Sequence, residues 1–227
     1  MAAFKPALIV VDFQEDFCPP NGSLAVQGGR DIADSVNALL SLPFVLKIAT
    51  KDWHPPSHVS FAANHDGKQP FTDYITITNP ANSNETYETR LWPVHCVQGT
   101  PGAELVPELE AGKVDKIIEK GQDDRVEMYS PFYDPFQEPR GCDSGLAGTL
   151  KDAGVTDVYV VGLAADYCVL NCAVDAAKEG FETFIVDEGT RAVDPEGWPK
   201  VRQGLEGKGV KVVSMESAAV QRLMTAF

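Results

Sequence analysis

Several side chains that carry chemistry stand directly after apolar stretches of this sequence. Asp12 follows the apolar run 7–11, Lys120 follows a short apolar stretch, and Cys168 follows the most hydrophobic stretch of the chain. A cysteine in the first turn of a helix lies beside unpaired backbone N–H groups, which favour the thiolate and can hold an oxyanion. We therefore interpret Cys168 as a nucleophile. Cys172, one helical turn later, is expected to pack in the core as a small hydrophobe.

The histidines suit a metal site better than a Cys–His pair. Asp52 and His54 are two residues apart, so in extended backbone both side chains project from the same face and can reach one ion. Two imidazoles and one carboxylate favour zinc or another divalent transition metal, with positions left open for water or substrate. The spacing does not select the third ligand, because His58, His65 and His95 all qualify.

If histidine is taken up by metal, the base that activates the thiol must be a carboxylate. Asp12, at the end of an apolar run, is the natural candidate, although such a residue can also serve as a cap or a structural hydrogen-bond acceptor. Lys120 beside Asp12 and Cys168 would favour the thiolate; the alternative is a solvated lysine at a strand end. The sequence contains no GxGxxG, GxxxxGK[ST] or GxSxG motif after a strand, which argues against nucleotide-binding enzymes and serine α/β-hydrolases.

The elements that must position these residues alternate between strands and helices. Strands are predicted at 7–12, 44–50, 116–119, 158–164, 181–186 and 210–214, and helices at 31–40, 145–153, 167–178, 199–207 and 217–223. This alternation predicts an α/β fold, a three-layer, doubly wound, mostly parallel sheet with helices on both faces. Ligands of such sheets bind beyond the carboxyl ends of the strands. Between about 52 and 113 we predict irregular loops that serve function.

Length and charge narrow the function classes. The 227 residues favour a single domain spanning 1–227, and 19 basic against 33 acidic residues give a net charge of −14. That charge argues against nucleic-acid and membrane partners and favours a small-molecule substrate. Five cysteines without CxxC spacing and no apolar segment of 18 residues predict an intracellular, cytoplasmic protein without a disulfide framework, with a nuclear or peroxisomal location still open.

Five stretches of this sequence, taken together, resemble one family. In order they are Val11-Asp12-Phe13-Gln14-Glu15-Asp16-Phe17, Asp52-Trp53-His54-Pro55, Trp92-Pro93-Val94-His95-Cys96, Glu119-Lys120-Gly121 and Gly162-Leu163-Ala164-Ala165-Asp166-Tyr167-Cys168-Val169. They resemble the isochorismatase-like cysteine hydrolases, specifically the nicotinamidases, over about 7–215. Any one motif is modest evidence, whereas five in register are specific.

The resemblance implies a role for each matching position. The catalytic triad would be Asp12, Lys120 and Cys168, and the metal ligands would be Asp52, His54 and His95, with zinc the usual ion and iron or manganese also compatible. The oxyanion hole would be the backbone N–H groups of Ala164 and Cys168, with a cis peptide between Leu163 and Ala164. Members of the family often self-associate, so a homo-oligomer is also expected.

The resemblance further implies an aromatic pocket for a pyridine ring, lined by Phe17, Trp92 and Tyr129, with Glu127 near the metal or its waters. Ala165 departs from the threonine of many relatives but touches no proposed catalytic group. The proline-rich stretch 130–139 is long for this loop, and we expect it to influence substrate access.

These residues together predict metal-dependent hydrolysis of nicotinamide to nicotinate and ammonia through a cysteine thioester, in NAD salvage. A heteroaromatic nitrogen gives the metal a ligand, which favours nicotinamide as the substrate. The alternatives are another cysteine amidase, acting on pyrazinamide or an N-carbamoyl amide, and a non-catalytic interaction module on the same fold. An isochorismatase acting on a vinyl ether would leave the nucleophilic cysteine unexplained.

Overall fold

A six-stranded parallel sheet forms the centre of the computed structural model, which describes residues 3–225. Its order is β5–β2–β1–β6–β7–β8, and every neighbouring pair is parallel. The bounds are β1 (Pro6–Val11), β2 (Leu46–Asp52), β5 (Lys116–Lys120), β6 (Asp157–Leu163), β7 (Glu182–Arg191) and β8 (Val210–Val213). The chain winds outward from β1 in both directions, so the predicted doubly wound α/β fold is confirmed.

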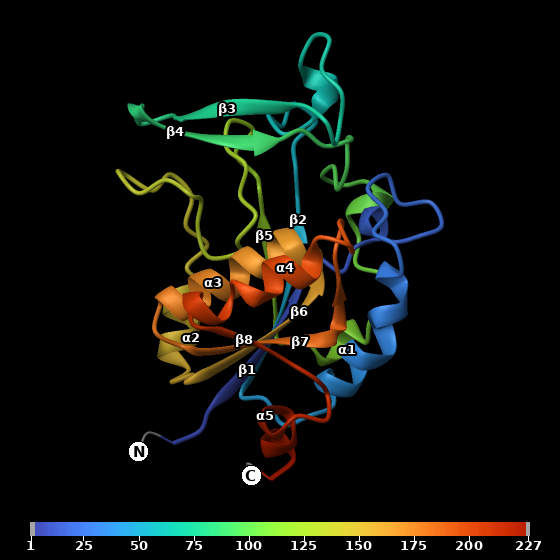
Figure 1. The fold of residues 1–227 in the computed structure, drawn as a ribbon, viewed down its shortest axis with the longest axis vertical. Coiled ribbons are helices and arrows are strands. Elements are labelled where there is room, and N and C mark those ends of the chain that lie inside the picture. Colours follow the sequence, from blue (N-terminus) through green and yellow to red (C-terminus); the bar gives the residue numbers. More distant parts are fainter. Residues whose placement is uncertain (1–2, 226–227) are drawn as a thin grey trace.

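Helices cover both faces of this sheet (Figure 1). On one face α1 (Ala33–Leu40) and α5 (Ala218–Gln221) share a core cluster, and on the other face α2 (Leu146–Asp152), α3 (Leu170–Lys178) and α4 (Trp198–Gln203) cover a second one. Strand β1 is apolar throughout because both of its faces are buried. Leu8 and Val10 pack into the first cluster and Ile9 and Val11 into the second, and all four are fully buried.

The segment predicted to be irregular contains a hairpin, so that prediction was wrong in part. Strands β3 (Tyr74–Asn79) and β4 (Asn82–Arg90) pair antiparallel and lie apart from the main sheet (Figure 1). Most of the hairpin is polar and only partly buried, so it carries little of the apolar periodicity of a core strand. The alternation of Ile75 and Ile77 with threonines was the one signal that could have revealed β3.

Several predicted boundaries also shift. Strand β2 runs on to Asp52 and β7 to Arg191, because both extend into the site described below. The predicted helix at 167–178 begins only at Leu170, after a single wide turn over Ala165–Val169. Within the described chain, no helix is both long and apolar enough to cross a membrane.

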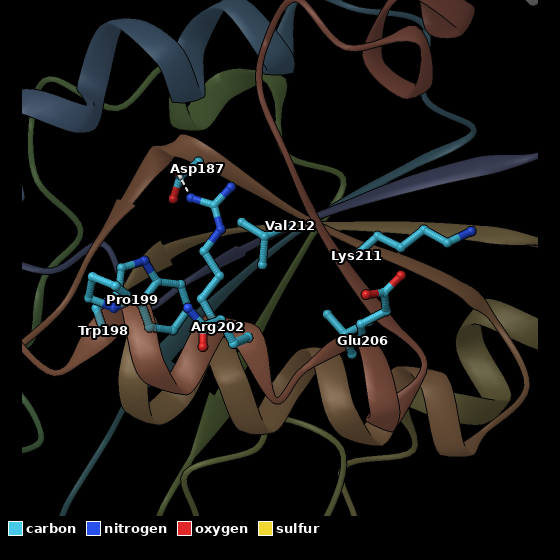
Figure 2. A pocket seen from close by; sticks show the side chains of 9 residues that line it. Asp187, Trp198, Pro199, Arg202, Glu206, Lys211 and Val212 are labelled. Atoms are coloured by element: carbon cyan, nitrogen blue, oxygen red, sulfur yellow. Dashed lines mark hydrogen bonds and ion pairs between the residues drawn. The ribbon is translucent and has the colours of Figure 1, made fainter.

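A hollow of about 600 Å³ lies between α4 and the edge strand β8 (Figure 2). Its two cationic side chains are already paired, since Arg202 bonds Asp187 at 2.6 Å and Lys211 forms an ion pair with Glu182. The residues singled out in the sequence lie elsewhere, at the carboxyl ends of the strands.

Candidate active site

Four ionisable side chains meet where four parallel strands end. Lys120 closes β5, Asp52 closes β2, Asp12 follows β1, and Cys168 lies in the turn after β6. Lys120 Nζ lies 3.0 Å from Asp12 Oδ2 and 3.6 Å from Cys168 Sγ, and it also forms an ion pair with Asp52 Oδ1. None of the four is more than 5% exposed. We call these residues the strand-end cluster.

Asp12 is held in an uncommon backbone conformation. Its φ is +45°, in the left-handed region that residues other than glycine seldom adopt, although aspartate tolerates it better than most. Its N–H donates to the carbonyl and the hydroxyl of Thr50, and the Thr50 hydroxyl donates to Oδ1 at 2.5 Å. Burial raises the pKa of Asp12 to about 6, although the charge of Lys120 acts in the opposite direction.

Burial raises the pKa of the Cys168 thiol well above its usual value, although Lys120 opposes the shift. The sequence-based expectation of a thiolate was therefore wrong for the resting site. Cys168 does lie in the first helical turn after β6, Ala165–Val169, but desolvation outweighs the nearby cation. Lys120 itself stays charged, because Asp12 and Asp52 outweigh its burial and hold its pKa well above the usual value.

The turn after β6 is closed by the Ala164 carbonyl. This carbonyl accepts hydrogen bonds from the N–H groups of Tyr167 and Val169, the two residues that flank Cys168, both at 3.1 Å. The Leu163–Ala164 peptide is cis, as the resemblance implied. Wide turns of this kind recur at functional sites.

The three predicted metal ligands lie together. Asp52 Oδ2 is 3.5 Å from His54 Nε2 and 3.8 Å from His95 Nε2. His54 Nδ1 bonds the Gly121 carbonyl and His95 Nδ1 bonds the Pro93 carbonyl, each at 2.8 Å, so both rings turn Nε2 towards the carboxylate. Gly121 permits this approach, because a Cβ there would overlap the His54 ring.

This arrangement fits a divalent cation. His54 Nε2 is buried and has no hydrogen-bond partner within residues 3–225. Burial and the neighbouring His54 lower the pKa of His95 to about 4, so its Nε2 keeps a lone pair. Burial disfavours the charged form of Asp52, but Lys120 and His54 act in the opposite direction and the pKa of Asp52 is lowered. Two imidazole nitrogens and a carboxylate, with carbonyls fixing the rings, form a donor set that zinc, iron or manganese accepts.

The other two histidines are occupied by protein partners. His58 Nδ1 lies 2.8 Å from the Ser60 hydroxyl and its Nε2 lies 3.2 Å from the Val126 carbonyl. His65 Nε2 lies 2.6 Å from the Val59 carbonyl. Of the three candidates that spacing left open, only His95 joins Asp52 and His54 in one group of possible ligands.

A small, narrow pocket of about 20 Å³ lies over Cys168. All three aromatic residues that the resemblance implied line it, and Glu127 lines it too. The full lining is Phe17, Leu24, Asp52, Trp92, His95, Glu127, Tyr129, Ala164, Tyr167, Cys168 and Val193. Residue-by-residue reading missed Leu24, Tyr167 and Val193. No residue of the 130–139 stretch is in this lining, but several of them line an adjoining hollow together with Glu127, Tyr129 and Tyr167.

The hairpin fixes the aromatic wall of this pocket. Trp92 Nε1 donates to the Tyr129 hydroxyl at 2.9 Å, and the Thr89 hydroxyl of β4 lies 2.9 Å from the same oxygen. Arg90, at the end of β4, donates to the Tyr167 hydroxyl at 3.1 Å. The hairpin that the sequence did not reveal therefore holds the pocket aromatics in place.

Asp166 has a structural role that its position beside the nucleophile did not reveal. Its two carboxylate oxygens accept the N–H groups of Val193 and Asp194, each at 2.9 Å. The carboxylate thereby ties the loop after β7 to the turn that carries Cys168, and Val193 closes one side of the pocket.

Comparison with known proteins assigns this architecture. The family model described as the isochorismatase domain matches residues 6–217. The chain belongs to the isochorismatase family. It is 43% identical over 191 residues to the nicotinamidase of Acinetobacter baylyi, covering 84% of this chain and 83% of that protein. The predicted family, and with it an amide hydrolase, is confirmed.

Solved structures of family members agree with the fold. The yeast nicotinamidase bound to the inhibitor nicotinaldehyde superposes with a TM-score of 0.85 at 34% identity, covering 92% of this chain and 99% of that chain. The pyrazinamidase of Pyrococcus horikoshii in complex with zinc superposes with a TM-score of 0.69, also at 34% identity and the same coverage.

Proposed function

We propose that this protein hydrolyses nicotinamide to nicotinate and ammonia through a thioester on Cys168, and that it serves NAD salvage. The observation that carries the proposal is the placement of Cys168, paired with Asp12 and Lys120, at the floor of an aromatic pocket whose wall includes two of the candidate metal ligands. The nicotinamidase relatives support the choice of substrate.

Asp12 acts first, as a general base. The thiol is protonated at rest because burial raises its pKa, and Asp12, with a pKa of about 6, is mostly ionised at neutral pH and can take the proton. Lys120 lies within 3.6 Å of the sulfur and stabilises the thiolate as it attacks the carboxamide carbon. Once Asp12 has taken the proton it is neutral, so Lys120 is paired with one negative carboxylate fewer.

The turn after β6 then stabilises the tetrahedral oxyanion through the N–H groups of Ala164 and Cys168. Protonated Asp12 returns its proton to the departing nitrogen, which leaves as ammonia and gives the thioester. Asp12 next removes a proton from water, which attacks the thioester. Asp12 returns this proton to the departing sulfur of Cys168, and the nicotinic acid that is released ionises to nicotinate.

Asp52, His54 and His95 would hold a divalent metal beside this pocket. Zinc is the proposed ion, with iron and manganese compatible with the same donors. When bound, the metal supplies a Lewis acid for the ring nitrogen and so orients the carboxamide over the sulfur. Phe17, Trp92 and Tyr129 provide the flat apolar walls that a pyridine ring requires.

Ammonia release from matched substrates tests the proposal. We expect hydrolysis of nicotinamide, slower or comparable hydrolysis of pyrazinamide, no hydrolysis of N-carbamoyl amino acids, and loss of activity after treatment with a chelator that zinc restores. Preference for an N-carbamoyl amide would replace nicotinamide as the substrate. Failure on all three substrates with metal loaded would instead support a non-catalytic module.

A further inference from the structure

Strands β1 and β2 separate just where the site begins. Their pairing reaches Val10 opposite Ala49, and the N–H of Asp12 still donates to the Thr50 carbonyl at 3.2 Å. In a regular parallel ladder, the Asp12 carbonyl would next accept the N–H of Asp52. That carbonyl is instead taken by the N–H of Gln14 at 2.9 Å. The backbone of Asp52 therefore loses its neighbouring strand at the residue that carries the carboxylate.

The side chain of Gln14 takes the place of the missing strand. Its Oε1 accepts the Asp52 N–H at 2.7 Å, and its Nε2 donates to the Asp52 carbonyl at 2.8 Å and to the Ala103 carbonyl at 2.8 Å. Gln14 is fully buried. A single carboxamide thus reproduces both hydrogen bonds that a paired strand would give Asp52, and it anchors them to the loop at Ala103.

We propose that Gln14 is a positioning residue for the metal ligand Asp52. The proposal rests on the metal site of the proposed function. Asp52 has two tasks, because Oδ1 pairs with Lys120 of the triad while Oδ2 faces the two imidazoles. Its carboxylate can serve both only if the backbone at the end of β2 is fixed, and Gln14 is the group that fixes it on the open side. On the other side, β2 is paired with β5 at Lys120.

A buried amide could also contribute to stability alone, and the hairpin offers a matched control. Asn79 is 2% exposed and likewise uses both ends of its amide. Its Nδ2 donates to the Pro139 carbonyl at 2.9 Å and to Glu85, and its Oδ1 accepts the Ala81 N–H at 2.9 Å. Asn79 has no hydrogen bond to the strand-end cluster or to the imidazoles, so its loss should affect folding without affecting the metal ligands.

The test measures zinc affinity by competition with a chromogenic chelator, on folded protein, for Gln14→Met, Gln14→Asn and Asn79→Leu. Methionine keeps the length and removes all three side-chain hydrogen bonds, whereas asparagine keeps the amide on a side chain too short to reach. We expect both Gln14 variants to bind zinc about 10- to 100-fold more weakly, as for other residues that orient metal ligands. Asn79→Leu should bind zinc as the wild type does, although its melting temperature falls.

Zinc affinity within twofold of the wild type in Gln14→Asn would overturn the proposal, and this variant decides the matter if Gln14→Met does not fold. An equal loss in Asn79→Leu, or a wild type that does not bind zinc, would also overturn it. Ammonia release from nicotinamide is recorded separately. A wild type that binds zinc but releases no ammonia contradicts the proposed function and leaves the role of Gln14 standing, whereas an active enzyme with unchanged zinc affinity in the variants contradicts Gln14 alone.

Discussion

The two halves of the candidate site are built in different ways. The strand-end cluster comes from the carboxyl ends of adjacent parallel strands, where Asp12, Asp52, Lys120 and Cys168 meet with almost no exposure. The aromatic wall comes from segments that join the sheet only through loops. Trp92 and Tyr129 meet through a hydroxyl that the hairpin residue Thr89 also contacts.

The difference separates chemistry from recognition. A parallel sheet fixes the distance between its strand ends by its own ladder, so the reacting groups are positioned by the main core. The aromatic wall depends on a few side-chain hydrogen bonds to a partly exposed hairpin. Changes in the strand-end cluster should therefore lower kcat, and changes in the wall should raise KM.

The largest effect is expected from Asp12→Asn, which keeps the shape and removes the base. We predict a fall in kcat of about 10⁴-fold with KM changed by less than about threefold, because an amide cannot take the thiol proton. Steady-state ammonia release measures both constants. Asp157→Asn, in a buried carboxylate of β6 remote from the pocket, is the matched control and should keep wild-type kcat. A change in KM with an unchanged kcat in Asp12→Asn would contradict the proposed division between the two halves.

A smaller but still large effect is expected from His54→Ala. It removes the imidazole whose Nε2 faces Asp52 and has no hydrogen-bond partner within the described chain, so zinc affinity should fall at least about 100-fold. Metal content after dialysis measures this loss. His65→Ala removes a histidine whose ring bonds the Val59 carbonyl and lies outside the group of possible metal ligands, so this variant should retain the metal. Equal metal content in the two variants would exclude His54 from the metal site.

The smallest effect is expected in the aromatic wall. Tyr129→Phe keeps the ring but removes the oxygen that Trp92 and Thr89 share. We predict that KM for nicotinamide rises about three- to tenfold, the cost of one or two neutral hydrogen bonds, while kcat stays within about twofold. If kcat falls as far as in Asp12→Asn, the wall acts on the chemical step and the separation between the halves fails.

The sequence predicted the strand-end half better than the wall, and the reason is physical. Asp12 follows β1 and Lys120 closes β5, two strands of one parallel sheet, so their meeting at one edge follows from the strand pattern and the general geometry of such sheets. The third candidate metal ligand, His95, lies in a loop, and only the family resemblance selected it.

The features of the site that the sequence did not predict depend on contacts between distant segments, which no local sequence pattern encodes. Thr89 and Arg90 of the hairpin bond the pocket residues Tyr129 and Tyr167, and the hairpin itself carries little apolar periodicity. The pKa of Cys168 depends on how deeply the turn is buried, which spacing does not give. The sequence showed Gln14 only as one residue of a family motif. Its hydrogen bonds to the backbone of Asp52 arise because β1 and β2 separate at that point, which the sequence does not show.

The central claim is that Cys168 is the group that attacks nicotinamide, and comparison of two thiols on one helical face tests it most directly. Ammonia release from nicotinamide is measured for zinc-loaded Cys168→Ala and Cys172→Ala. Cys172 is fully buried in the core, so its variant should keep kcat within about threefold of the wild type, whereas Cys168→Ala should fall to background, at least about 10⁴-fold lower. Turnover by folded Cys168→Ala within tenfold of the wild type would contradict the account.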